Sequence, residues 1–307
     1  MKTKLLLPLA LLASFVLLQS NKGSSETPPA GAVEKIASAL PAEAHAKPSK
    51  SRKLLVFSAT AGFRHASIAT GKVALTELGR KTGAFEALVS DDLAHFEPDA
   101  IQQFDAICFL STTQDVLSPH PEVLKKMSDE EKKAATERTA RLRKSLMDFI
   151  ESGKGFVGIH AATDTLYNMP EYGRMIGGYF NGHPWNAAAE VQIDVEKGME
   201  QHPLAAMFNG QSMNFKEEIY QHKDPYNSRK QQVLLRLNVE KSAKVGGMKR
   251  SDGDYGVAWA RNHGKGRVFY CSLGHNHDMY WNPKILSHYL AGIQWAIGDL
   301  QAKVVHE

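Results

Sequence analysis

The sequence predicts an α/β protein with a mostly parallel sheet and helices on both faces of that sheet. Short, continuous apolar runs, typical of strands buried on both faces, alternate with longer segments of helical periodicity. Polar segments follow these runs directly, as loops do at the carboxyl edge of a parallel sheet. Because strands that alternate with helices are usually joined by crossover connections, this order indicates the α/β class.

The first half of the chain contains four predicted strands. They are the apolar runs at 54–57, 85–89, 105–110 and 156–159. A helix predicted over 68–81 connects the first two, with its apolar residues on one side. A longer, charged helix is predicted over 129–151, because Ser128 and Glu131 form a capping box at its start. Its lysines and arginines lie mostly opposite its apolar residues, which is typical of a solvated helix face.

The second half of the chain is less regular and ends in a hairpin and a helix. Strands are predicted at 191–195, 233–237, 256–261 and 267–272. The last two flank 262–266, whose sequence NHGKG is typical of a hairpin loop, so we expect an antiparallel hairpin near the C-terminus. A short helix near 171–176 and a final helix over 284–298 complete the predicted elements.

The N-terminal region predicts an exported protein. Two lysines precede an apolar stretch at 5–18, which is the pattern of a secretory signal peptide and is short for a membrane span. We expect a signal peptide over 1–22, a flexible linker over 23–51 rich in Ala, Pro, Ser, Glu and Lys, and one folded domain over 52–300. The mature protein would be periplasmic or extracellular with no stable membrane span, and the alternative is an uncleaved membrane anchor.

Charge and cysteine content limit the function classes. The formal net charge is +4 and no basic stripe is visible, so a nucleic-acid partner is not expected. Cys108 and Cys271 are the two cysteines of the chain, and each lies in an apolar, strand-like run. We expect both to be small buried hydrophobic residues, because two interior strands seldom place cysteines in disulfide geometry.

Histidines follow three of the predicted strands. The loops after the strands are 61–67, 111–115, 160–164 and 273–278. Since ligands bind beyond the carboxyl ends of the strands in an open parallel sheet, we expect His65, His160 and His275 to meet in one pocket. Histidine transfers protons near neutral pH and is also the commonest metal ligand, so this convergence predicts a functional site.

Two uses of these histidines stay open. His275 and His277 are two residues apart, which puts both side chains on one face of an extended segment. Together with His160 they are the predicted ligands of a divalent transition metal, with His65 and Glu218 as further candidates, although no cofactor is certain. Glu218 could instead act as a base, or be a surface charge.

Five short motifs occur in order between Lys53 and Gly298. They are Gly62-Phe63-Arg64-His65, Gly158-Ile159-His160-Ala161-Ala162-Thr163-Asp164, Gly178-Tyr179-Phe180-Asn181-Gly182-His183-Pro184, Glu218-Ile219-Tyr220 and Ser272-Leu273-Gly274-His275-Asn276. Together they resemble the ThuA-like (trehalose utilisation) family. The resemblance implies a flavodoxin-like fold similar to that of class I glutamine amidotransferases. Those enzymes hold a nucleophilic cysteine at a strand-to-helix elbow, where this chain has His160, so amidotransferase activity is not implied.

The resemblance also implies a carbohydrate-derived substrate, such as a disaccharide or glycoside oxidised at its 3-position. The first hypothesis is therefore a carbohydrate-metabolism enzyme that uses acid/base chemistry, with or without a metal. His160 and His65 would be its acid/base pair, Asp164 would orient one imidazole, and Glu218 would complete the catalytic set. The predicted substrate-binding residues are Arg64, His183, Trp185, Tyr220, His275, Asn276 and Trp281.

The sequence is also consistent with two other functions. One is a non-catalytic carbohydrate-binding protein that uses Trp185, Tyr280 and Trp281 as platforms for the apolar faces of sugars. The other is a metal-dependent hydrolase that acts on a non-sugar ester or amide. In each case the expected partner is a small molecule, and a homo-oligomer is also allowed by the sequence.

Overall fold

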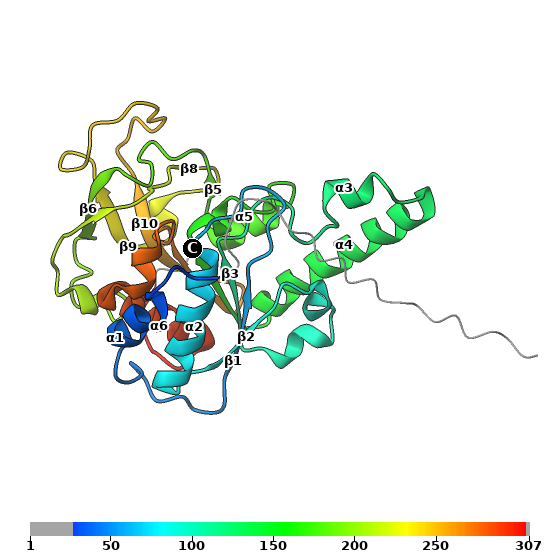
Figure 1. Cartoon of the computed structure of the whole chain (residues 1–307), viewed down its shortest axis with the longest axis horizontal. Coiled ribbons are helices and arrows are strands. Elements are labelled where there is room, and N and C mark those ends of the chain that lie inside the picture. The colour runs from blue at the N-terminus through cyan, green and yellow to red at the C-terminus, as the bar shows by residue number, and fades with distance from the viewer. Residues whose placement is uncertain (1–26, 305–307) are drawn as a thin grey trace, which may run out of the picture.

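A computed structural model describes residues 27–304, and in this part of the chain one large sheet carries helices on both faces (Figure 1). The strands are β1 (Lys53–Phe57), β2 (Glu86–Val89), β3 (Ala106–Leu110), β4 (Gly155–Ile159), β5 (Tyr179–Phe180), β6 (Glu190–Val195), β7 (Met213–Lys216), β8 (His222–Lys223), β9 (Gln232–Asn238), β10 (Gly256–His263) and β11 (Gly266–Cys271). The α-helices are α1 (Ala32–Ala39), α2 (Ile68–Thr82), α3 (Pro121–Leu124), α4 (Asp129–Glu151), α5 (Pro170–Ile176) and α6 (Pro283–Ile297).

The parallel half of the sheet has the strand order β2-β1-β3-β4-β11. This is the flavodoxin-like order, in which a ligand site is expected at the carboxyl ends of the central strands. The predicted fold class is therefore confirmed, and every strand predicted in the first half of the chain is present. The final strand β11 lies beside β4, so the loop that follows it reaches the same edge as the loops after β1 and β4.

The antiparallel half of the sheet is larger than the single hairpin predicted. The hairpin of β10 and β11 is present, and β9, β6 and β7 continue the sheet beyond it in antiparallel pairs. Strand β7 was not predicted, nor was the separate pair of β5 and β8. Both strands of that pair have two residues, which is too short to show an alternating pattern.

Side chains alternate between the two faces of the sheet, and each face packs against a different helical layer. In β1, Leu54 and Val56 belong to the core cluster that includes α2 and α6, whereas Leu55 and Phe57 belong to the cluster that includes α4 and α5. This is the period-two alternation of a strand with both faces covered. Figure 1 shows α1, α2 and α6 together on one side, and α4 on the other.

The two cysteines behave as predicted. Cys108 in β3 and Cys271 in β11 are both buried and both free. Burial raises the pKa of the Cys271 thiol to about 12, so neither a disulfide nor a reactive thiolate is expected from it.

The charged helix α4 begins where the sequence predicts. The Ser128 hydroxyl accepts a hydrogen bond from the Glu131 backbone N–H, and the Glu131 carboxylate accepts one from the Ser128 N–H. Its second half packs on the sheet through Leu142, Leu146 and Phe149, among others. Its first half projects from the body together with α3 (Figure 1).

The prediction of a flexible linker over 23–51 is wrong for residues 27–51. Helix α1 lies in this segment, and Ala32 and Ile36 are buried on one side of it, against α2 and the 3-10 helix η6 (His277–Trp281). Farther along, the Gln294 side chain accepts from the His45 backbone N–H and donates to the Ala46 carbonyl. The compositional argument failed because a few apolar residues at helical spacing suffice to dock a short helix.

The predicted signal peptide at 1–22 lies outside the residues that the structure describes. Between residues 27 and 304 there is no helix that is both long and apolar enough to cross a membrane.

The burial of His288 in α6 leads us to expect that the free energy of unfolding depends on pH. Its imidazole is buried, Nδ1 donates to the Leu204 carbonyl at 2.6 Å, and burial lowers its pKa to about 4. A histidine with a lowered folded-state pKa contributes stability above about pH 6.5 that is lost as the pH falls toward 4. Between about pH 4 and pH 6.5, His288 binds a proton in the unfolded chain but not in the folded protein. The free energy of unfolding therefore rises with pH by about 1.4 kcal/mol per pH unit from this residue alone.

We expect His288→Asn to reduce that slope by about 1.4 kcal/mol per pH unit, the contribution of one proton. Asn keeps a donor for the Leu204 carbonyl and does not titrate. Denaturant unfolding of both proteins at several values between pH 4 and pH 7 measures the difference. Parallel curves for the two proteins would contradict the assignment.

Candidate active site

The centre of the candidate site is His160, at the elbow between β4 and the short 3-10 helix η3 (His160–Thr163). Its backbone has φ +52°, in the left-handed region that non-glycine residues rarely occupy. Such conformations persist only where the surroundings impose them, and they cluster at functional sites. Here the tight turn brings the side chain of His160 to the carboxyl edge of the sheet.

The tautomer of His160 is fixed by two hydrogen bonds. Nδ1 lies 2.8 Å from the carbonyl oxygen of Ser272, which can only accept, so Nδ1 carries the proton. Nε2 therefore has a lone pair, and the Tyr220 hydroxyl donates to it at 3.0 Å. Burial, reinforced by the neighbouring histidines, holds the pKa of His160 well below its ordinary value, so the ring is neutral at physiological pH.

His65 and His275 lie directly beside His160. The ring centroids are 4.6 Å apart for His65 and His160, 5.3 Å for His65 and His275, and 5.4 Å for His160 and His275. All three pairs are close to perpendicular. The structure thus brings together the three histidines that follow β1, β4 and β11.

His65 is a buried imidazole that receives no hydrogen bond from the described residues. It is 5% exposed, and its Nδ1 has no partner. Burial is the main reason that its pKa falls to about 3, and the nearby His275 lowers it further. A ring with so low a pKa is a poor proton donor near neutral pH, so His65 does not suit the acid role of the predicted acid/base pair.

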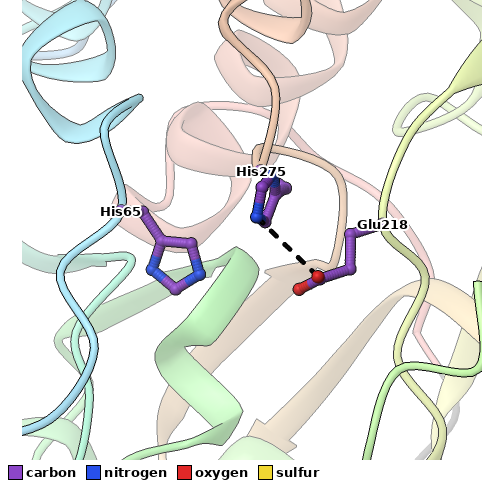
Figure 2. Close-up of side chains that lie close together, drawn as sticks. All are labelled: His65, Glu218 and His275. Carbon is purple, nitrogen blue, oxygen red and sulfur yellow. Dashed lines mark ion pairs between the residues drawn. The ribbon is translucent and has the colours of Figure 1, made fainter. Parts of the chain in front are cut away.

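Glu218 faces the histidines from the opposite side of the site (Figure 2). Its carboxylate oxygens lie 3.7 Å from Nε2 of His160, 3.3 Å from Nδ1 of His183 and 3.7 Å from Nε2 of His275. The residue is 7% exposed, and burial raises its pKa to about 7. Glu218 is therefore part of the site and not a surface charge.

Glu217 is the functional residue that the sequence did not predict. Its buried carboxylate accepts three backbone hydrogen bonds from the loop after β11, from Gly274 at 2.9 Å, His275 at 2.6 Å and Asn276 at 3.0 Å. Burial raises its pKa to about 8, although the three N–H donors act in the opposite direction. Successive residues of an extended segment point to opposite sides. Glu217 accordingly holds the loop that carries His275, while Glu218 faces the imidazoles.

A glycine is required within this loop. Gly274 has φ +137°, and a Cβ there would lie 2.8 Å from the Tyr280 hydroxyl and 3.1 Å from Ile159. The close approach lets the loop turn over the elbow at His160.

The outer part of the site is partly aromatic. His183 is the exposed member of the histidine group and stacks on Phe180, with ring centroids 5.9 Å apart. Phe63 is 66% exposed and packs its ring edge-on against His65 at 4.8 Å. Tyr220, predicted to bind substrate, is buried beneath this rim and contacts Phe180 and His160.

Of the two tryptophans predicted to bind substrate, Trp185 is buried and Trp281 is half-buried. Trp185 is fully buried, packs against Tyr255, and donates its indole N–H to the Ala243 carbonyl at 3.0 Å. Trp281 stacks on His277 and lies under the Lys35 ammonium of the N-terminal segment. The ring of Trp185 is therefore not accessible to a sugar.

Three of the predicted site residues, Asp164, Arg64 and Asn276, form hydrogen bonds within the protein. Asp164 does not orient an imidazole, because its carboxylate accepts from Tyr167 at 2.5 Å and Gln114 at 3.3 Å, and burial raises its pKa. Arg64 donates to the Ser58 carbonyl at the end of β1. Asn276 donates to the Lys216 carbonyl at 2.7 Å, and its side-chain oxygen lies 3.2 Å from Nδ1 of His275.

The group that could hold a metal ion combines His275 with the two further candidate ligands, His65 and Glu218. His65, Glu218 and His275 each offer one ligand atom, and these three atoms lie within 4.8 Å of one another. The other two predicted ligands, His160 and His277, are not in this group. His160 has both ring nitrogens in hydrogen bonds, and Nδ1 of His277 lies 2.7 Å from the Thr70 hydroxyl.

Comparison with known proteins gives one family match. The sequence profile of the ThuA family, described as trehalose utilisation, matches residues 53–296. Comparison with curated proteins gives no match.

Solved structures are similar in fold. A ThuA-like protein from Bacteroides uniformis is 20% identical, with 82% of this chain and 94% of that chain covered and a TM-score of 0.60. A ThuA-like protein from Parabacteroides merdae is 15% identical, with 81% and 91% covered and a TM-score of 0.55. A cytoplasmic protein from Salmonella typhimurium is 10% identical, with 80% and 98% covered and a TM-score of 0.52. At these identities the structures support the fold alone.

Proposed function

The chain belongs to the ThuA (trehalose utilisation) family, and we propose that it is an enzyme that acts on a disaccharide or glycoside oxidised at its 3-position. The observation that carries the proposal is the neutral, buried His160, whose Nε2 lone pair is directed into a group of three further histidines and one carboxylate. The neutral ring can accept a proton at Nε2, and Glu218, whose pKa is raised to about 7, lies 3.7 Å from that nitrogen.

The proposed reaction is an elimination. A keto group at C3 acidifies the hydrogen on C2, and His160 Nε2 accepts this proton once substrate displaces the Tyr220 hydroxyl from it. The electron pair forms the C1=C2 bond as the C1–O glycosidic bond breaks. The leaving oxygen takes a proton from the imidazolium form of His183, which is left as a neutral imidazole and whose Nδ1 lies 3.3 Å from Glu218. In this scheme His183, and not His65, is the acid that works together with His160 as the base.

The rest of the site positions these groups. The Ser272 carbonyl holds His160 in the tautomer that leaves Nε2 free to accept. Phe63 and Phe180 at the rim offer apolar surface for a sugar ring, in place of the buried Trp185. We also propose that the enzyme acts outside the cytoplasm, in accord with the export signal that the sequence predicts.

Incubation with 3-keto-trehalose in D2O tests the proposal. We expect glucose release together with an unsaturated keto sugar, and deuterium at C2 of any recovered substrate, followed by NMR. Unoxidised trehalose is the matched control and should remain unchanged, because its C2 hydrogen is not acidic. Neither exchange nor cleavage of the keto sugar, with and without added divalent metals, would rule out this function.

A metal-dependent hydrolase of a non-sugar ester or amide is the second candidate. It is favoured by the two imidazoles and one carboxylate of His65, Glu218 and His275, a donor set found in catalytic zinc sites. The non-catalytic alternative has less support, because Trp185 and Tyr280, two of its three proposed platforms, are fully buried.

A further inference from the structure

We propose that His65, Glu218 and His275 bind one divalent transition-metal ion, and that His160 stays outside its coordination shell. The three ligand atoms lie within 4.8 Å of one another, and the side chains converge from three separate segments of the chain (Figure 2). The inference deepens the proposed function of this site, but its evidence is independent of any sugar.

His65 provides the first argument. A polar ring that is 95% buried is normally hydrogen-bonded, since an unsatisfied buried polar group costs free energy. No hydrogen bond from the described residues reaches this imidazole, and its Nδ1 is buried without a partner. One ring nitrogen faces Glu218 and His275 in Figure 2. Coordination of a cation by that nitrogen would give the ring the partner it lacks.

His275 provides the second argument. Its Nδ1 lies 3.2 Å from the Asn276 side-chain oxygen, so this nitrogen donates and Nε2 is left as the lone-pair donor. Nε2 is the atom that faces Glu218, at 3.7 Å. A metal-bound histidine usually donates its other N–H to an oxygen acceptor that fixes the ring, and Asn276 is placed to do this.

The donor types indicate the class of ion. Two imidazoles and one carboxylate suit Zn²⁺, Fe²⁺, Co²⁺ or Mn²⁺, and the absence of sulfur among these donors argues against Cu⁺. Three protein ligands leave a coordination position for water or substrate. Bonds of about 2.1 Å at a tetrahedral ion place ligand atoms about 3.4 Å apart, so binding draws the three side chains inward.

His160 lies beside the ion without binding it. Nδ1 is held by the Ser272 carbonyl and Nε2 by the Tyr220 hydroxyl. With the ring centroid of His160 4.6 Å from that of His65, a substrate bound at the open position would meet Nε2 of His160. The ion would supply a Lewis acid for a carbonyl oxygen, while His160 remains the proton acceptor.

Titration of the EDTA-treated, full mature protein with Zn²⁺ by calorimetry tests the site, with Co²⁺ and its visible absorption as a second probe. We expect one ion per chain. Glu218→Gln and His275→Ala should each lower the affinity by roughly 100-fold or more. His277→Gln is the matched control, because His277 bonds to Thr70 outside the group, and it should bind like wild type. Circular dichroism of each variant checks folding.

Absence of stoichiometric binding in the folded wild-type protein would overturn the site, as would full affinity in folded Glu218→Gln. Loss of binding in His160→Asn comparable to that in His275→Ala would overturn the assignment of His160 outside the shell. Proton exchange on the keto sugar by a protein that binds no metal would leave the proposed function standing without the metal site. One tightly bound ion with no reaction on the sugar would support the metal site and remove the sugar function.

Discussion

His160→Asn is expected to lower the rate of proton abstraction from the keto sugar by about 10²- to 10⁴-fold, the range contributed by a general base. Asn is chosen because it tolerates the left-handed conformation that His160 adopts at φ +52°. Its amide can also donate to the Ser272 carbonyl, which accepts from Nδ1 of His160. The substitution thus removes the proton acceptor while it preserves the elbow. Deuterium exchange at C2 of 3-keto-trehalose measures the effect.

Tyr220→Phe separates the base from its hydrogen-bond partner. The phenolic hydroxyl donates to Nε2 of His160, and its removal leaves the imidazole and the Ser272 contact in place. We expect a smaller loss than in His160→Asn, since the acceptor nitrogen remains. Exchange at the wild-type rate in a folded His160→Asn variant would show that another group takes the proton.

The fold and the meeting of the histidines were predictable because they depend on local patterns. Apolar runs identify the strands, and the rule for carboxyl ends then places the loops after β1, β4 and β11 at one edge. His65, His160 and His275 lie in those loops, and their rings are in contact. The first step is local, whereas the second assumes that β11 runs parallel to β1 and β4, and the pairing of β11 with β4 confirms this.

The errors concern residues whose surroundings come from distant parts of the chain. Trp185 was predicted to bind substrate because an aromatic ring can stack on a sugar. In the structure it is buried, with its ring against Tyr255 and its N–H bonded to the Ala243 carbonyl. Glu217 accepts from backbone N–H groups, which have no signature in the sequence. One signal was available: Glu217 and Glu218 are adjacent, so in an extended segment only one of them can face the pocket.

Glu217→Ala is expected to destabilise the protein by about 3–5 kcal/mol, because it leaves three loop N–H groups without their buried acceptor. Glu217→Gln should cost less, about 1–3 kcal/mol. In Glu217→Gln, the amide oxygen can take the place of Oε1 and keep the hydrogen bonds from Gly274 and His275. The amide nitrogen then takes the place of Oε2, where it meets the Asn276 N–H and cannot accept its hydrogen bond. Denaturant unfolding measures both values.

The control is Glu240→Ala, at an exposed position, which should change stability by less than about 0.5 kcal/mol. Glu217 touches no imidazole, so its effect on the site passes through the loop that carries His275. We therefore expect weaker Zn²⁺ binding in Glu217→Gln even where the variant is fully folded, because His275 loses its fixed position while every proposed ligand is still present. Wild-type stability in Glu217→Ala would mean that the loop is held by its other contacts, chiefly those of Asn276 with the Ala187 and Lys216 carbonyls.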